Sequence, residues 1–379
     1  MELTGLLAVP FESFGSILSY VVPFIVVMSF IVFFHELGHF MVARWCGVKV
    51  EVFSIGFGRE IFGWYDRHGT RWRVAWIPLG GYVRFKGDAD AASRPDHDSP
   101  VAADPDSFPA KPLWQRALIV AAGPLANFIL AIVLFAGIYA FVGVPVMEPV
   151  VDEVMPGSAA EEAGFRPGDR ILAINGREIR SFGELREIVA MSAGEPLRIL
   201  VEREGRKVEL VATPRLKEVP DGIGGRIKVG VLGIVHRQTG AVRHEKAGPL
   251  EAVGLAARQT WNIVAGTMKY LKQMIVGRQS TDQLAGPIRI AQVTSQAASI
   301  SFIALVSLAA VLSVSIGLIN LFPIPMLDGG HLLYYAIEAV RGRPLSESAQ
   351  EFGFKVGMML VLTLMLLATF NDIRHLFMD

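Results

Sequence analysis

Four stretches of this chain are long and apolar enough to cross a lipid bilayer, and they restrict the possible folds more than any other feature. A membrane-spanning helix needs about 20 apolar residues. Because a backbone in hydrocarbon must satisfy its own hydrogen bonds, each stretch is predicted to be a helix, and the fold a polytopic α-helical membrane protein with four transmembrane helices. The stretches are residues 17 to about 42, 117–144, 300 to about 321, and 352–370.

The composition supports a membrane protein and excludes some partners. Hydrophobic residues make up 52% of the chain and charged residues 19%, which is too apolar for an ordinary soluble protein of 379 residues. Lys plus Arg and Asp plus Glu both total 36, so the charge balance gives no reason to expect a nucleic-acid partner. The single cysteine, Cys46, excludes a disulfide framework and a zinc site built from several thiolates, so a metal site here must use His and carboxylates.

Basic residues near the span ends predict the orientation of the chain in the bilayer. The first sixteen residues contain no Lys or Arg, whereas the segment from Arg44 to Arg116 contains eleven. That segment is expected on the cytoplasmic side, which puts residues 145–298 and both termini on the outer side. With no basic region ahead of it, the first apolar run is expected to be a retained span and not a cleaved signal.

The cytoplasmic segment contains two stretches with the alternation of a β-strand. Trp72, Val74 and Trp76 share one face of TRWRVAW, and the same alternation recurs in YVRFK, residues 82–86. Between them PLGG, residues 78–81, is a turn signal. The prediction is a membrane-associated β-hairpin between the first and second spans.

The outer segment has the pattern of a small α+β domain over residues 148–216. Turns at PGD and NG flank a strand, and Ser181 with Glu184 three positions later predicts the start of a helix. The stretch PGDRILAING resembles a PDZ domain. Further on, Pro249–Ile275 has helical periodicity and is expected to pack on its own protein or to rest on the outer leaflet.

The first apolar run ends in FFHELGHF, which contains His35, Glu36 and His39. Strongly polar groups at membrane depth cost several kcal/mol unless something compensates them, so they are functional by default. In an α-helix residues four apart share a face, and the two His can therefore ligate one ion while the Glu projects beside it. In such HExxH sites zinc brings the pKa of a bound water toward 7, and the glutamate accepts its proton.

Catalytic zinc usually takes three protein ligands, so a third must come from elsewhere in the chain. Asp328 is offered by INLFPIPMLDGGH, where the third apolar run breaks at two prolines. The first and third spans both run from outside to inside in the predicted topology, which brings Asp328 to the depth of the His pair. His331 is a competing ligand, although a role outside the ligand set or a structural role suits it better.

These motifs together resemble the site-2 protease family, and most closely its bacterial regulator-of-sigma-E branch. The residues concerned are HELGH in the first span, AGPLAN at 122–127, NLFPIPMLDGG at 320–330 and the PDZ-like domain, so the resemblance covers nearly the whole chain. It implies a Zn²⁺ ion held by His35, His39 and Asp328, with Glu36 as general base. It also implies cleavage, in the bacterial cytoplasmic (inner) membrane, of the transmembrane segment of an anchored protein, typically an anti-sigma factor already trimmed outside.

Physical constraints, apart from the resemblance, predict how a substrate binds. A helical substrate must unwind before its carbonyls can be attacked, so we expect it to add as a strand to the hairpin. Candidate substrate-binding residues are Trp76, Gly80, Gly81 and Tyr82. The family associates Asn320 with handling substrate, and a polar residue that ends a helix explains it equally well.

The best-known members of the family have two tandem PDZ domains, whereas this chain has room for one. That domain would bind a peptide or C-terminus or exclude bulky proteins.

The expected organisation has seven parts. They are the first span with HELGH (1–44), the segment with the hairpin (45–113), the second span (114–147), the PDZ-like domain (148–216), a linker and amphipathic region (217–298), the third span with NxxPxxxxDG (299–345) and the fourth span (346–379). Two other functions remain open. An ion transporter also uses broken spans with His and Asp, and an inactive scaffold would present the PDZ domain alone.

Overall fold

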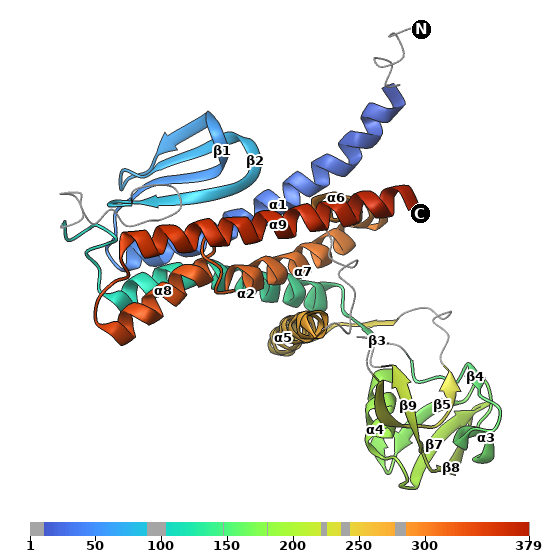
Figure 1. Ribbon diagram of the computed structural model, residues 1–379. Coiled ribbons are helices and arrows are strands. Elements are labelled where there is room, and N and C mark those ends of the chain that lie inside the picture. Colours follow the sequence, from blue (N-terminus) through green and yellow to red (C-terminus); the bar gives the residue numbers. More distant parts are fainter. Residues whose placement is uncertain are drawn as a thin grey trace. The chain divides into compact units, whose positions relative to one another are not determined.

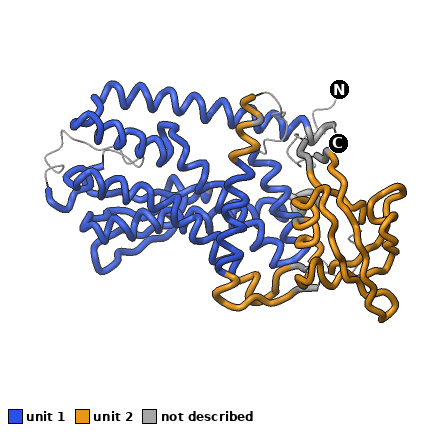
Figure 2. Tube along the Cα trace, turned by 90° about the horizontal axis from the view of Figure 1, so that it is seen from below, with its two compact units in different colours: residues 1–136, 253–267, 280–379 blue, residues 137–252, 268–279 orange. Residues whose placement is uncertain are grey.

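The computed structural model describes residues 11–88, 104–146, 148–179, 181–220, 226–235, 243–276 and 286–378. The chain divides into two compact units, which Figure 2 distinguishes by colour. Unit 1 comprises Met1–Ala136, Val253–Thr267 and Ser280–Asp379, and unit 2 comprises Gly137–Ala252 and Met268–Gln279.

Four helices are long and apolar enough to cross a membrane, as the sequence predicts. They are α1 (Phe11–Trp45), α2 (Leu113–Phe141), α7 (Phe302–Asn320) and α9 (Glu347–Met378) (Figure 1). Each covers most of one predicted span. The apolar residues on these helices are largely exposed in the isolated chain, notably on α9, and this is expected for helices whose outer faces contact lipid.

A hairpin forms in this segment from β1 (Val50–Tyr65) and β2 (Arg71–Phe85). Both predicted strands lie in β2, so the predicted pairing between them and the predicted turn at PLGG are wrong. Strand β2 continues through residues 78–81, and the chain reverses at residues 66–70. The two strands bend, so the first half of β1 pairs with both halves of β2: Phe53 lies opposite Val83 and also opposite Trp72. The proline and glycines of PLGG therefore bend a strand instead of ending it, and they leave residues 80–85 at one edge of the sheet.

Three further helices accompany the four long apolar helices. Helix α5 (Pro249–Ile275) confirms the predicted amphipathic helix, and α8 (Asp328–Arg341) begins at the LDGG motif. Helix α6 (Pro287–Ile300) was not predicted, and it contacts α1, α7 and α9. The Asp372 carboxylate on α9 accepts hydrogen bonds of 2.9–3.0 Å from three N–H groups at the start of α6, so a residue 86 positions away caps this helix.

Unit 2 is built around a four-stranded antiparallel sheet in the order β6-β5-β7-β8. The strands are β5 (Arg170–Ile174), β6 (Arg177–Glu178), β7 (Leu197–Arg203) and β8 (Arg206–Ala212). Helices α3 (Ala159–Glu162) and α4 (Phe182–Met191) pack with it around a core that includes Ile171, Ile199 and Leu185. The predicted cap of α4 is confirmed, because Ser181 Oγ accepts the Glu184 N–H at 3.1 Å.

Six short strands pair outside that sheet and extend unit 2 beyond residue 216. Pairs form between β3 (Val144–Val146) and β12 (Arg243–Glu245), β4 (Glu153–Val154) and β11 (Ile234–Val235), and β9 (Arg215–Pro220) and β10 (Arg226–Val231). The predicted domain at 148–216 lies inside this unit.

Candidate metal centre

Two histidines of α1 and the first residue of α8 converge in unit 1. His35 Nε2 lies 3.3 Å from His39 Nε2 and 3.1 Å from Asp328 Oδ2, and His39 Nε2 lies 3.6 Å from the same oxygen. A tetrahedral zinc ion with bonds of about 2.0–2.1 Å would hold its ligand atoms about 3.3 Å apart. The spacing of the three side chains therefore fits one such ion, and they form the chain's only group of this kind among the residues searched in the described segments.

The hydrogen-bond partners of these three side chains are also consistent with metal binding. His39 Nδ1 lies 2.9 Å from the carbonyl oxygen of Ile119, and His35 Nδ1 lies 3.2 Å from the amide nitrogen of Asn127. Each imidazole is thus held at Nδ1 by α2 and presents Nε2 to its partner. Asp328 Oδ2 is buried without a hydrogen bond, which is costly for a carboxylate oxygen unless a cation completes its surroundings.

Glycines allow α1 and α2 to approach closely enough for these contacts. A Cβ atom on Gly38, inside HELGH, would lie 2.3 Å from the Ala122 carbonyl oxygen. A Cβ on Gly123 would lie 2.2 Å from His39 Nε2. AGPLAN therefore supplies the surface on which His39 rests. The sequence analysis gives this motif no role in the site. The signal that could have revealed such a role is the Asn of the motif, a polar residue inside a long apolar run.

Helix α8 is fixed by the segment that precedes it and by an ion pair. Cβ atoms on Gly329 and Gly330 would come within 2.4 Å of the backbone oxygens of Phe322 and Ile324, so the DGG glycines let the chain fold back tightly on the proline segment. Farther along α8, Glu338 accepts hydrogen bonds from Arg116 of α2 at 2.6 and 3.4 Å, and both side chains are largely buried. These contacts set the direction of α8 and hence the position of Asp328.

A cavity of about 200 Å³ opens beside the three side chains. Glu36, Asn320 and His331 line it, so residues from α1, α7 and α8 meet there. Of the candidate substrate-binding residues, Gly81 and Tyr82 also line the cavity, at the edge of the sheet. Trp76 does not line it and is 67% exposed. Gly80 packs against the Phe57 ring instead.

The sheet is fastened to α1 through the turn of the hairpin. Asp66 accepts hydrogen bonds from Arg44 and Trp72 and from the backbone N–H groups of His68 and Thr70. Burial alone would raise the pKa of Asp66, but these donors outweigh it and lower the pKa from 3.8 to about 2. The carboxylate therefore remains charged and paired throughout the physiological pH range.

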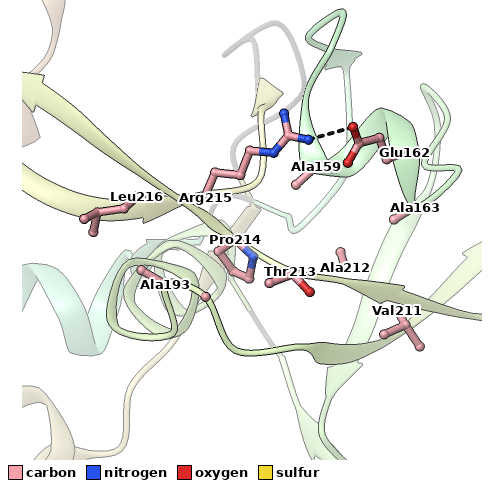
Figure 3. A pocket seen from close by; sticks show the side chains of 11 residues that line it. Ala159, Glu162, Ala163, Ala193, Val211, Ala212, Thr213, Pro214, Arg215 and Leu216 are labelled. Atoms are coloured by element: carbon pink, nitrogen blue, oxygen red, sulfur yellow. Dashed lines mark hydrogen bonds and ion pairs between the residues drawn. The ribbon is translucent and has the colours of Figure 1, made fainter.

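Unit 2 contains a larger cavity that lacks this chemistry. Its volume is about 560 Å³, and Figure 3 shows it lined mainly by small apolar side chains. The only ion pair drawn there joins Arg215 and Glu162, at 2.6 Å. Its lining among the described residues contains no His or Cys and so differs from that of the cavity at the metal centre.

Comparison with known proteins places these residues in a family. The model of the family described as "Peptidase family M50" matches residues 23–364, which include all four side chains of the centre. A protein of Agrobacterium fabrum named "Putative zinc metalloprotease" is 48% identical over 367 residues, covering 96% of this chain and 97% of its own. "Metalloprotease MmpA" of Caulobacter vibrioides is 44% identical over 380 residues, covering 93% and 95% respectively. The chain belongs to peptidase family M50, the site-2 protease family of zinc metalloproteases.

Proposed function

We propose that this protein hydrolyses a peptide bond inside the transmembrane segment of a membrane-anchored substrate. The observation that carries the proposal is the convergence of His35, His39 and Asp328 beside Glu36, with the two histidines and Glu36 on α1, a helix apolar enough to cross a bilayer. A substrate of the anti-sigma-factor type, already trimmed on the outer side, suits a site of this kind. The proposed location is the bacterial inner membrane, with both termini and unit 2 outside.

The side chains divide the chemistry among them. His35, His39 and Asp328 would hold Zn²⁺, which when bound would acidify a water molecule and polarise the substrate carbonyl. Glu36 follows His35 directly on α1 and lines the same cavity, so its carboxylate would take the proton from the attacking water. It would then deliver that proton to the leaving amine.

The edge of the sheet supports a binding mode for the unwound substrate. The Lys86 N–H points toward β1 and donates a hydrogen bond to the Lys49 carbonyl oxygen, whereas the Phe85 N–H points away from β1 and donates to the Asp88 carboxylate. By the alternation of a strand, the Val83 N–H also points away from β1, and it bonds with Glu36. A substrate strand that added here would take over the Val83 N–H from Glu36 and lie beside the general base. Asn320, in the same cavity, would hold the substrate amide beside it.

Proline at the edge tests strand addition. Val83→Pro removes the outward N–H, and we expect cleavage to fall at least about tenfold while zinc content is unchanged. Val83→Ala, which keeps the N–H and removes side-chain volume, is the matched control and should retain most of the cleavage. Normal cleavage by a folded Val83→Pro protein would reject this binding mode.

Unit 2 is proposed to be a PDZ domain that binds an extended peptide or a C-terminus. Helix α4 and strands β10 and β11 border a groove of about 310 Å³. Its lining is mainly apolar, from Phe182 and Leu185 on one side to Val231 and Ile234 on the other. A helix facing a strand across an apolar groove is the geometry that accepts a peptide by β-augmentation.

The Glu36→Gln variant separates the protease from the two rival functions. We expect the purified variant to bind zinc as the wild type does and to fail to cleave a membrane-anchored test substrate. Retained cleavage would contradict the assignment of the general base. An inactive scaffold would show no cleavage in the wild type either, and a transporter would move ions without cleaving.

A further inference from the structure

Asn127 is a fully buried polar side chain beside the metal centre, and the proposed chemistry gives it no role. It lies on α2 with no exposed surface, in a stretch of that helix, residues 117–138, that is otherwise apolar. An amide in such surroundings is costly unless it has hydrogen-bond partners. Its side chain faces His35 Nδ1 at 3.2 Å, on the opposite edge of the imidazole from the metal-facing Nε2.

The backbone of Asn127 is held in place from a third helix. Ser313 of α7 donates a hydrogen bond of 2.8 Å to the Asn127 carbonyl oxygen. A Cβ atom on Gly317, one turn farther along α7, would lie 3.1 Å from Asn127 Cβ, so the two helices are in close contact at this point. With the backbone fixed, a half turn about the last side-chain bond exchanges the amide oxygen and nitrogen without moving the helix.

The contact made by His39 shows which orientation suits a metal. Its Nδ1 faces a backbone carbonyl, which can only accept a hydrogen bond, so Nδ1 carries the proton and Nε2 presents a lone pair. The same tautomer is needed at His35. However, the Asn127 amide nitrogen faces His35 Nδ1, and donation from it would leave the proton on Nε2, which could not then bind a metal.

Turning the amide by half a turn resolves this conflict. Asn127 Oδ1 is buried without a hydrogen bond, and the oxygen and nitrogen of an amide exchange places on such a rotation. We propose that Asn127 Oδ1 accepts a hydrogen bond from His35 Nδ1–H in the zinc-loaded protein. Asn127 is then a positioning residue that selects the metal-binding tautomer of His35, as the Ile119 carbonyl does for His39. The inference rests on the proposed zinc ligation by His35.

Zinc affinity, measured on the purified full chain by competition with a chelator, tests the role of Asn127. Asn127→Leu keeps the approximate size of the side chain and removes the acceptor, and we expect zinc affinity to fall about 10- to 100-fold. Asn127→Asp keeps an acceptor oxygen, and its affinity should stay within about threefold of the wild type. Cobalt(II) in place of zinc gives a second readout, since its visible absorption should change in Asn127→Leu and not in Asn127→Asp.

A control separates positioning from simple packing. Leu130 is buried on the same helix, and Leu130→Ala should lower thermal stability without changing zinc affinity. Wild-type zinc affinity in a folded Asn127→Leu protein would overturn the inference and leave the proposed protease intact. Equal losses in Asn127→Leu and Asn127→Asp would also overturn it, because the amide would then act as a donor. A wild type that binds no zinc would overturn both proposals.

Discussion

At the scale of single residues, the sequence predicts the partners that share one helix, and of the partners on other helices it predicts Asp328 but misses Gly123 and Asn127. His35, Glu36 and His39 belong to one helical turn and its neighbour, so their spacing alone brings them together. Asp328 was reachable because two spans of the same direction end at the same depth. Gly123 and Asn127 contact the histidines only through the packing of α2 on α1, which no local pattern determines.

Gly123 gives the first prediction at this scale. In Gly123→Ala the new methyl group would stand 2.2 Å from His39 Nε2, so the ring must move from its metal-facing position. We expect zinc affinity to fall at least about tenfold. Gly137→Ala is the matched control, because a Cβ at this position of α2 meets no atom within 4 Å. Equal zinc affinity in both variants, measured by chelator competition, would contradict the contact.

Asp66 gives the second, through its effect on stability. Because its pKa is lowered from 3.8 to about 2 in the folded protein, the stabilisation is fully present above the ordinary pKa and is lost as the pH falls toward 2. At neutral pH we expect Asp66→Asn to cost about 1–3 kcal/mol. The difference in Tm between the variant and the wild type should therefore shrink as the pH is lowered from 4 to 2. A difference that is constant over this range would show that the charge of Asp66 is not involved.

The pair between Glu60 and Arg71 in the same sheet serves as the control for Asp66. Both side chains are about a third exposed, so solvent screens the pair. Glu60→Gln should lower Tm less than Asp66→Asn does. A larger loss of Tm in Glu60→Gln than in Asp66→Asn would contradict the importance given to the hairpin turn.

At the scale of elements, the long apolar helices followed from hydropathy, whereas the bent sheet and α6 did not. PLGG carries the residues of a turn, yet both of its flanks pair with the same segment of β1, and sheet pairing overrode the local signal. Helix α6 has no strong apolar stripe. Its start depends on the Asp372 carboxylate and its sides on three other helices, so it is formed by tertiary contacts that the sequence pattern does not reveal.

Helix α9 provides a prediction for the support of the metal centre. A Cβ atom on Gly357 would lie 1.9 Å from the Pro325 carbonyl oxygen, so α9 rests directly on the segment that leads to Asp328. Gly357→Ala should displace that segment and reduce both zinc content and cleavage by at least about tenfold. Gly266→Ala on α5, where a Cβ meets no atom within 4 Å, should have no effect. Full zinc content and cleavage in Gly357→Ala would show that α9 does not support the site.

At the scale of the whole molecule, the proposed function depends on which side of the membrane each part of the chain occupies. Cys46 is the only cysteine, so Cys46→Ser gives a background without thiols. Gly205→Cys in the β7–β8 turn and Gly69→Cys in the β1–β2 turn both place a thiol where a Cβ meets no atom within 4 Å, and both strain the turn to a similar degree because the φ angles are +76° and +80°. In intact cells with a permeable outer envelope, we expect a membrane-impermeant maleimide to label Gly205→Cys alone. Gly69→Cys should be labelled only after lysis, and the reverse pattern would overturn the predicted topology.

The measurement that tests the central claim most directly is the zinc content of the purified full chain, by mass spectrometry of the metal. Two segments almost 300 residues apart are expected to hold one ion, so the wild type should contain one zinc per chain and Asp328→Ala should contain almost none. His331→Ala, altered on the same helix and in the same cavity, should keep its zinc. Undiminished zinc in Asp328→Ala, or a wild type without zinc, would contradict the account.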